Sequence, residues 1–551
     1  MNSIKQWVVS GKPWIWLTGG AVSVSLISVL GLLLLIGWKG LTYFWPMPLS
    51  AWNDNNGKLI VGQIYQRDSV PLDHLPEQKQ ALIDKSIQSG SVKRLSVKIA
   101  NRELYSLDFI SLLEGDISEV YYPTNWAILE RTQNGNFFGK PIAYVTANGR
   151  YTSDVATHIR HGIDFANTLR VEIQRISDNE IRQVGWKLSQ LRLEKRKVEL
   201  NGTLTDDYIN KYKANKRVLT SLLSEAEAKL ELLRSRLREE FLLIEDMTGQ
   251  QRQISLEAIL DVWYPNNMTV AEKLWHWAVQ VKKFIVGEPR EANSEGGVFP
   301  AIFGTVFLVM MMSVIVTPLG VIAAIYLHEY ATNNALTRLI RVSVINLAGV
   351  PSIVYGVFGL GFFVYSIGGS IDELFYAERL PTPTFGTPGI LWSALTLALL
   401  TLPVVIVSTE EGLSRIPSSV RNGSYALGAT QFETLWRIVL PMASPAIITG
   451  LILAIARAAG EVAPLMLVGV AKLAPSLPVD GNYPFIHLER KFMHLGYHIY
   501  DVGFQAPNTE AARPLVYATS FLLVLVVVGL NLTAINIRNN LREKYRSLGQ
   551  D

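Results

Sequence analysis

The chain has 551 residues but no cysteine, and its formal net charge is only +4. The lack of cysteine excludes disulfides and thiolate metal sites, and it leaves the redox environment of the protein open. The small net charge, without a basic stripe interleaved with aromatic residues, argues against a nucleic-acid partner. No Gly-x-x-x-x-Gly-Lys-Ser/Thr segment occurs, so the chain does not bind ATP through that phosphate loop. No nucleophile–base constellation stands out either, so we expect neither an enzyme nor a cofactor site in this chain.

Hydrophobic residues make up 49% of the chain and charged residues 18%, and the apolar residues are concentrated in runs. The first run extends from Trp14 to Trp38. A secretory signal would have a shorter apolar core, of about 7–15 residues, and a small-residue cleavage site. Because Lys5 and Lys12 precede the run, we expect residues 1–45 to contain a retained spanning helix whose N-terminus is cytoplasmic.

Five further apolar runs follow after residue 296. Each approaches or exceeds the ~20 residues that a helix needs to cross the hydrocarbon core of a membrane. Six spans place both termini in the cytoplasm, and the basic C-terminal tail agrees with the positive-inside bias. We therefore expect a membrane core over residues 296–540 and a cytoplasmic tail over residues 541–551. The five runs are Phe299–Leu327, Val342–Ile367, Ile390–Ser408, Ala446–Val470 and Leu515–Ile535.

A large polar insert separates the first run from the others. Its first part, residues 46–152, is predicted to be rich in strands, because Leu95, Val97 and Ile99 alternate with polar residues. Asn134-Gly135, a turn-forming pair, also separates two strand-like runs. Residues 251–295 form a return segment that could rejoin these strands.

Residues 153–250 have the spacing of two long helices. Leucine, isoleucine and valine recur at intervals of three and four residues on both sides of Asn201-Gly202, and Thr205 marks the start of the second helix. We predict an antiparallel coiled-coil hairpin. Its charges alternate in sign as on a solvated surface, so the hairpin is either a spacer or a docking surface.

Two charged residues lie within the apolar run Ala446–Val470, which follows the loop between the fourth and fifth predicted spans. A charge at membrane depth costs about 2.5–3.5 kcal/mol on insertion scales, and such residues are therefore functional candidates. Arg457 and Glu461 are four residues apart, which places them on one face of a helix, one turn from each other. Either they neutralise each other and hold helices together, or Arg457 faces a central pathway and binds an anion through its guanidinium group.

A second candidate pathway element lies in the third run. Gly349-Val350-Pro351-Ser352, with Asn346 just before it, is predicted to interrupt the helix, because proline removes a backbone donor. The interruption is either a packing kink or a break that lines a cavity. Asn346 and Ser352 are therefore candidate pathway residues together with Arg457 and Glu461.

The loop over residues 409–445 is predicted to be cytoplasmic and to contain two short helices that meet at Gly428. Thr430 and Glu433 have the spacing of a capping box for the second helix. Apolar residues are expected to line one face of that helix before Pro441 ends it. The helix either lies on the membrane or docks into a groove of a soluble partner. The apolar residues are Phe432, Leu435, Trp436 and Val439.

The segment SYALGATQFETLWRIVLP of this loop resembles the EAA loop of ABC-importer permeases. In that family a glycine is followed ten positions later by isoleucine and then by Leu-Pro, as Gly428, Ile438, Leu440 and Pro441 are here. The leading Glu-Ala of the family is replaced by Asn422-Gly423. The resemblance implies that the loop fits a cleft on a separate ATPase subunit. The residues it assigns to this coupling are Ala426, Gly428, Phe432, Ile438, Leu440 and Pro441.

Three more segments resemble the phosphate-specific, PstA-type branch of these permeases: YLHEYA, NLAGVPSIVYGVFGL and IARAAGEVAPL. The resemblance implies a mainly α, six-helix type I importer fold, here with an extracytoplasmic α+β insert. It implies the permease subunit of an ATP-driven phosphate importer in the bacterial inner membrane, with residues 46–295 periplasmic. The implied partners are a second permease subunit, two ATPase subunits and a periplasmic phosphate-binding protein. Arg457 and Glu461 fall on the charged pair of the family's fifth helix.

Three alternatives stay open at this point. The cargo could be another oxyanion, such as phosphonate or molybdate, because arginine accepts any of them. The chain could instead be a membrane-anchored interaction protein that acts through the outer helical hairpin. His494 and His498 have the spacing of a helical metal site, but no complete ligand set is visible, and packing among aromatic residues is the favoured interpretation.

Overall fold

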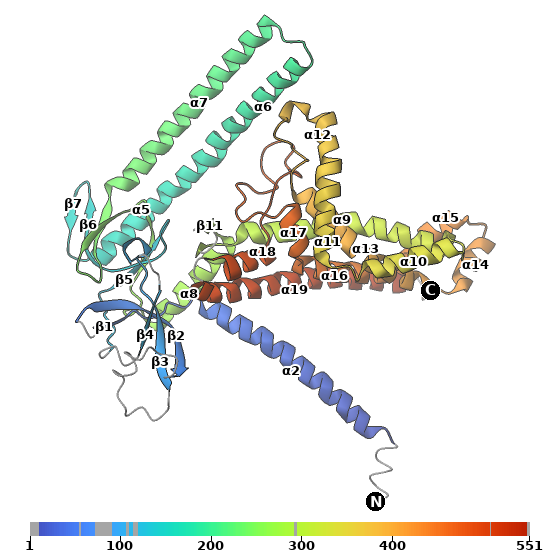
Figure 1. Ribbon diagram of the computed structural model, residues 1–551, viewed down its shortest axis with the longest axis horizontal. Coiled ribbons are helices and arrows are strands. Elements are labelled where there is room, and N and C mark those ends of the chain that lie inside the picture. The colour runs from blue at the N-terminus through green and yellow to red at the C-terminus, as the bar shows by residue number, and fades with distance from the viewer. Residues whose placement is uncertain are drawn as a thin grey trace, which may run out of the picture. The chain divides into compact units, whose positions relative to one another are not determined.

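The computed structural model describes residues 10–53, 57–71, 91–105, 109–113, 120–290, 295–506 and 509–547. The chain divides into two compact units. The membrane unit comprises residues 1–44, 284–289 and 298–551, and the polar unit comprises residues 45–283 and 290–297. Figure 1 shows the elements of both units, which are described separately below.

The membrane unit has six helical segments, among the described residues, that are long and apolar enough to cross a membrane. The six predicted spans are therefore confirmed, although the bounds of all of them differ, those of the third and the fifth most. Between the spans lie the shorter helices α10 (Ala335–Leu347), α14 (Ser418–Ala426), α17 (Ala463–Val468) and α18 (Leu495–Tyr500), whereas α15 (Gln431–Thr434) opens the fifth span. The spans are built from α2 (Lys12–Thr42), α9 (Phe299–Ile325), α11 (Ser352–Phe358) with α12 (Gly369–Phe375), α13 (Ile390–Ser414), α16 (Leu440–Gly460) and α19 (Thr509–Ser547).

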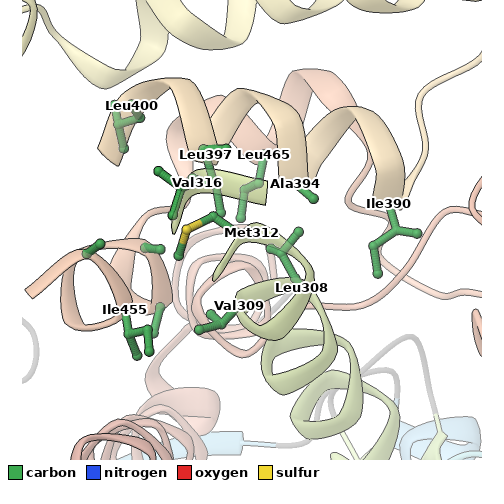
Figure 2. Close-up of a cluster of buried hydrophobic side chains, with 14 of the residues drawn as sticks. Leu308, Val309, Met312, Val316, Ile390, Ala394, Leu397, Leu400, Ile455 and Leu465 are labelled. Atoms are coloured by element: carbon green, nitrogen blue, oxygen red, sulfur yellow. The ribbon is translucent and has the colours of Figure 1, made fainter. Parts of the chain in front are cut away.

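The core of the membrane unit forms around α13, the most buried of the six spans. Apolar side chains of α13 interdigitate with those of α9, α16 and α17, as Figure 2 shows. α13 continues through Pro403 without ending. Labelled members of the cluster are Leu308, Met312, Leu397, Ile455 and Leu465.

The third predicted span, Val342–Ile367, is not one helix. Its first part belongs to α10, which Asn334 caps by accepting a hydrogen bond from the Thr337 N–H. The chain then turns over Ala348–Val350, and α11 begins at Ser352, directly after Pro351. Because a residue before proline is pushed out of the α region, the interruption occurs at the predicted place. The membrane-crossing part starts later than predicted and continues to Phe375 through a π-helical stretch, Gly359–Gly368.

The polar unit contains two main antiparallel sheets. Leu95, Val97 and Ile99 are buried, as the alternation predicts, and Asn134 and Gly135 both have positive φ, of 63° and 68°, between β5 and β6. The first sheet has the order β1 (Ser50–Asn53), β2 (Leu59–Pro71), β3 (Ser91–Lys98), β4 (Phe109–Leu113). The second has the order β10 (Ile259–Trp263), β5 (Ala127–Arg131), β6 (Phe137–Thr146), β8 (Phe241–Glu245), β9 (Gln251–Ser255), with β7 (Gly149–Tyr151) also on β6.

Two long helices extend from the second sheet. The first is continuous from α5 (Val155–Arg175) through a π turn at Ile176–Ile181 into α6 (Arg182–Leu200), and the second is α7 (Asp206–Glu239). Thr205 caps α7 by accepting a hydrogen bond from the Tyr208 N–H, as the restart signal predicts. Figure 1 shows α6 and α7 side by side and antiparallel. Their supercoiling as a coiled coil stays a prediction.

Candidate functional site

The fifth predicted span carries Arg457 and Glu461, but the helix ends between them. Arg457 lies in the last turn of α16, whereas Glu461 is already extended, with φ −78° and ψ 133°. The next helix, α17, has Pro464 in its first turn. Proline lacks the N–H that would bond to the Gly460 carbonyl, and α16 ends at this glycine. The prediction that Arg457 and Glu461 share one uninterrupted helical face is therefore wrong.

The two charges nevertheless remain together. The Arg457 Nε atom lies 3.6 Å from Glu461 Oε1, and the side chains are 32% and 21% exposed. This separation exceeds the 2.7–2.9 Å that is typical of a charge-assisted hydrogen bond. Within the part of the chain that the structure describes, Arg457 forms no hydrogen bond. Its guanidinium group is thus partly enclosed, positively charged and supplied with unused donors, which is the chemistry that an oxyanion requires.

The break in the third span lies beside this arginine. Tyr355 of α11, which is only 4% exposed, donates a hydrogen bond of 2.5 Å to the Leu347 carbonyl at the end of α10. The tyrosine thereby satisfies one of the carbonyls that a helix leaves unpaired at its C-terminus. Tyr355 also belongs to the buried cluster that contains Ile455 and Ala458, which flank Arg457 in α16. Sequence reasoning missed Tyr355, although it lies within the segment that carried the resemblance.

The two interrupted spans meet through α11 and α17. A Cβ atom placed on Gly356 would lie 2.7 Å from the Pro464 Cα atom, so only glycine allows this approach. Interrupted helices occur at membrane depth where protein or a water-filled cavity satisfies the freed backbone groups. Transporters place substrate sites at such breaks.

The other two predicted pathway residues lie on either side of the break in the third span. Asn346 is exposed in the last turn of α10, and Ser352 is half-buried at the first position of α11. Neither side chain forms a hydrogen bond or an ion pair with Arg457 among the described residues. The structure therefore brings Arg457, Glu461 and Tyr355 together, while the place of Asn346 and Ser352 on the pathway stays a prediction.

The loop between the fourth and fifth spans folds as two helices that meet at Gly428. Gly428 has φ 88°, a conformation that favours glycine. Thr430 and Glu433 form both hydrogen bonds of the capping box, which confirms that prediction. The Thr430 hydroxyl accepts a bond from the Glu433 N–H, and the Glu433 carboxylate accepts one from the Thr430 N–H. The second helix does not end at Pro441, however, because α15 continues through a π turn at Leu435–Val439 into α16. The bond from the Leu440 N–H to the Leu435 carbonyl widens the turn just before the proline ring, which relieves the clash expected in a regular helix.

The apolar residues of this second helix lie on two faces, not on the single predicted one. Leu435 and Val439 are buried against Leu413 and neighbouring residues of the membrane unit. Phe432 and Trp436 are 67% and 64% exposed, and their rings stack with centroids 6.3 Å apart. Leu427, at 91%, and Tyr425 are exposed nearby, as is Ala426, whereas Ile438, Leu440 and Pro441 are half-buried. The loop thus presents an apolar surface around Gly428 that no described side chain covers.

This loop is fastened to the end of α9. Arg421 of α14 donates hydrogen bonds to Glu329 Oε1, at 2.9 Å, and to the carbonyls of Leu413 and Ile416. The Arg421 and Glu329 side chains are only 17% and 11% exposed. The buried hydroxyls of Ser424 and Thr434, 2.8 Å apart, join the two helices of the loop. These bonds join the loop to the π turn Tyr326–Tyr330 that follows α9.

The two histidines that raised the question of a metal are buried. Burial lowers the pKa of His494 and of His498 to about 4, so both are neutral at physiological pH. The Nδ1 atom of His494 accepts a hydrogen bond from the Gly496 N–H and caps α18. Across the described ranges, no three histidine, aspartate or glutamate side chains converge as a metal site would need.

Comparison with known proteins adds information about the membrane unit. A family model described as the binding-protein-dependent transport system inner membrane component matches residues 316–547. The phosphate transport system permease protein PstA 1 of Mycobacterium tuberculosis (strain CDC 1551 / Oshkosh) is 36% identical over 245 residues, covering 44% of this chain and 71% of that protein. The probable ABC transporter permease protein YqgI of Bacillus subtilis (strain 168) is 31% identical over 259 residues, covering 46% and 81%. An inward-facing structure of the MetNI methionine ABC transporter matches 44% of this chain and 94% of its own, at 18% identity and a TM-score of 0.32.

Proposed function

The chain belongs to the family of binding-protein-dependent transport system inner membrane components, and we propose that it is the permease subunit of an ATP-driven importer of inorganic phosphate. Members of this family form the membrane passage of an importer, and a separate protein hydrolyses ATP. The chain is therefore a multi-pass inner-membrane subunit and not an enzyme. Phosphate is the cargo that the names of its relatives support.

The observation that carries the proposal is the state of Arg457. Its guanidinium group belongs to the last turn before the break in the fifth span, it is about one-third exposed, and its donors are not used by other described residues. Phosphate passing this point would receive two parallel hydrogen bonds from the guanidinium group. Glu461, 3.6 Å away, would hold the arginine in place between transport events and compete with the anion for it.

The exposed surface around Gly428 supports coupling to an ATPase. Apolar side chains exposed together on a loop at the membrane surface mark a docking site. The bonds from Arg421 to Glu329, to the Leu413 carbonyl of the fourth span and to the Ile416 carbonyl just after it would transmit movement of a docked ATPase to the spans. In the assembly that we propose, the importer has two permease chains of different type, two ATPase subunits and a phosphate-binding protein.

The charge distribution supports a defined orientation in the membrane. We place both termini in the cytoplasm and residues 46–295 in the periplasm. The loop after α9 contains Arg338 and Arg341, and the C-terminal tail is also basic. Basic residues of short loops stay predominantly on the cytoplasmic side.

Phosphate uptake by the intact complex tests the role of Arg457. We expect Arg457→Ala to lower uptake about ten- to a hundredfold, because hydrogen bonds to a charged group contribute about 1.5–3 kcal/mol. Arg457→Lys should retain part of the activity, since it keeps the charge but loses the paired donors. Arg150→Ala, at an exposed position in β7, is the control and should transport normally.

Normal uptake by both Arg457 variants, at normal assembly with the other subunits, would remove this role. Competition by phosphonate and molybdate in the same assay decides the cargo. A complex that imports either of them in preference to phosphate would retain the permease assignment and change the substrate.

A further inference from the structure

Helix α8 (Val270–Val286) has its polarity reversed relative to an ordinary surface helix. A surface helix normally turns its apolar stripe towards the protein and its polar side towards solvent. In α8 the apolar side chains recur at intervals of three and four residues and form an exposed arc. Trp275 is 74% exposed, Val270 70% and Leu274 53%. The arc comprises Val270, Leu274, Trp275, Ala278, Ile285 and Val286.

The polar side of α8 packs on the protein instead. The His276 ring lies against Trp263 of β10, with centroids 4.7 Å apart. Lys283 forms ion pairs with Asp261, at 2.7 Å, and with Glu130, at 3.3 Å. These contacts fix the rotation of the helix about its axis, so the apolar arc cannot turn inwards without breaking them. The contacts of His276 and Lys283 therefore keep the arc exposed.

The C-terminal end of α8 lies where two spans leave the hydrocarbon region. Phe284 is buried in the membrane unit, and its ring contacts Phe44, two residues after the end of α2, at 5.0 Å. The Phe284 carbonyl accepts a hydrogen bond from the Val298 N–H, directly before α9 begins. The Phe299 N–H bonds to the Gly287 carbonyl in the same way. The last turn of α8 therefore belongs to the membrane unit.

We propose that α8 is an interfacial helix whose apolar arc is immersed in the membrane interface. Helices of this kind lie in the membrane plane with tryptophan and aliphatic residues buried to the level of the headgroups. Trp275 has the amphipathic ring that favours this depth. Lys282, exposed among the apolar residues of the arc, extends its ammonium group to the lipid phosphates while its methylene groups stay in the apolar layer.

A bilayer fits this arc better than a second protein does. The arc combines small, aliphatic and aromatic side chains with one exposed lysine, and lipid phosphates supply the complementary charge. Seventeen residues correspond to about 25 Å of helix, which gives the arc several turns for contact with lipid. The proposal concerns this helix alone and does not depend on the cargo of the importer.

The absence of cysteine allows a direct test with single nitroxide labels. Ala271→Cys and Ala278→Cys place a label in the middle of the arc, and Glu272→Cys places one on the exposed polar border of the same helix. The full chain, within its complex, is reconstituted in vesicles of phosphatidylethanolamine and phosphatidylglycerol. Collision of the label with oxygen, which concentrates in lipid, is compared with collision with a water-soluble nickel chelate.

We expect oxygen to dominate at positions 271 and 278 and the chelate to dominate at position 272. Chelate collision at all three positions would show that the arc faces water and would overturn the proposal. Exclusion of both reagents at positions 271 and 278 would show that protein covers the arc, and it would overturn the proposal equally. Because both alanines are exposed, the substitutions should leave folding intact, and phosphate uptake by the labelled complexes checks this separately.

Discussion

Two arginine–glutamate pairs of the membrane unit differ in how many hydrogen bonds the arginine donates. Arg421 donates three hydrogen bonds, one of them to Glu329 at 2.9 Å, and both side chains of this pair are largely buried. Arg457 lies 3.6 Å from Glu461 and forms no hydrogen bond with the residues described. The sequence presents both as arginines near apolar runs. Only the geometry separates a charge that holds the structure from one that is available to a ligand.

The difference has a physical basis in the cost of leaving buried charges unpaired. A guanidinium group that has been desolvated must recover its hydrogen bonds from the protein, as Arg421 does from Glu329 and two carbonyls. A group that keeps unused donors needs water or a ligand at that point. Arg457 is therefore expected to face a hydrated or ligand-binding space, and its structural contribution should be small.

The largest expected effect is on stability, and it concerns Arg421. Arg421→Ala removes the permanent cation beside the buried Glu329 carboxylate, whose remaining partner is His328 Nδ1 at 3.0 Å, and we expect the free energy of unfolding to fall by about 3 kcal/mol, the lower end of the range for such pairs. Arg457→Ala should lower it by no more than about 1 kcal/mol, as for a partly exposed pair. Thermal unfolding of the purified complex in detergent measures both. Equal losses of unfolding free energy in the two variants would contradict the inference that Arg421 stabilises the structure more than Arg457 does.

The spans and the loop could be predicted from sequence because their signals are local. Apolar runs of sufficient length, and a threonine three residues before a glutamate, need no tertiary information. The helix breaks are different. Pro403 lies inside the continuous helix α13, whereas Pro464 follows the end of α16. Proline alone does not decide between these outcomes, because the result depends on which neighbours satisfy the freed carbonyl.

The site was only partly predictable for a related reason. Arg457 and Glu461 stand out as charges in an apolar run, and they are indeed together. Tyr355 and Glu329 act through partners eight and 92 residues away, the Leu347 carbonyl and Arg421, and no local pattern marks such pairs. The two faces of the helix at Phe432 were missed because exposure depends on what packs against the loop.

The next effect in size tests whether the two breaks must touch. Gly356→Val introduces a Cβ atom 2.7 Å from the Pro464 backbone, and overpacking of this kind costs about 1–3 kcal/mol. Because the change also separates the breaks beside Arg457, phosphate uptake should fall more than stability does. The matched control is Gly361→Val, since no atom lies within 4 Å of the Cβ position there. If the two variants transport alike, contact between the breaks is not needed for passage.

The smallest expected effect concerns Tyr355, whose hydroxyl group stabilises the structure and whose side chain packs beside the helix that carries Arg457. Tyr355→Phe keeps the ring in the core but removes the hydrogen bond to the Leu347 carbonyl, so stability should fall by about 1 kcal/mol. Tyr365→Phe, at a side chain that is 62% exposed, should change nothing and serves as the control. Uptake separates the two roles of the hydroxyl, because a purely structural group alters the melting temperature and leaves the KM for phosphate unchanged. A raised KM in Tyr355→Phe would mean that the tyrosine also shapes the space that Arg457 faces.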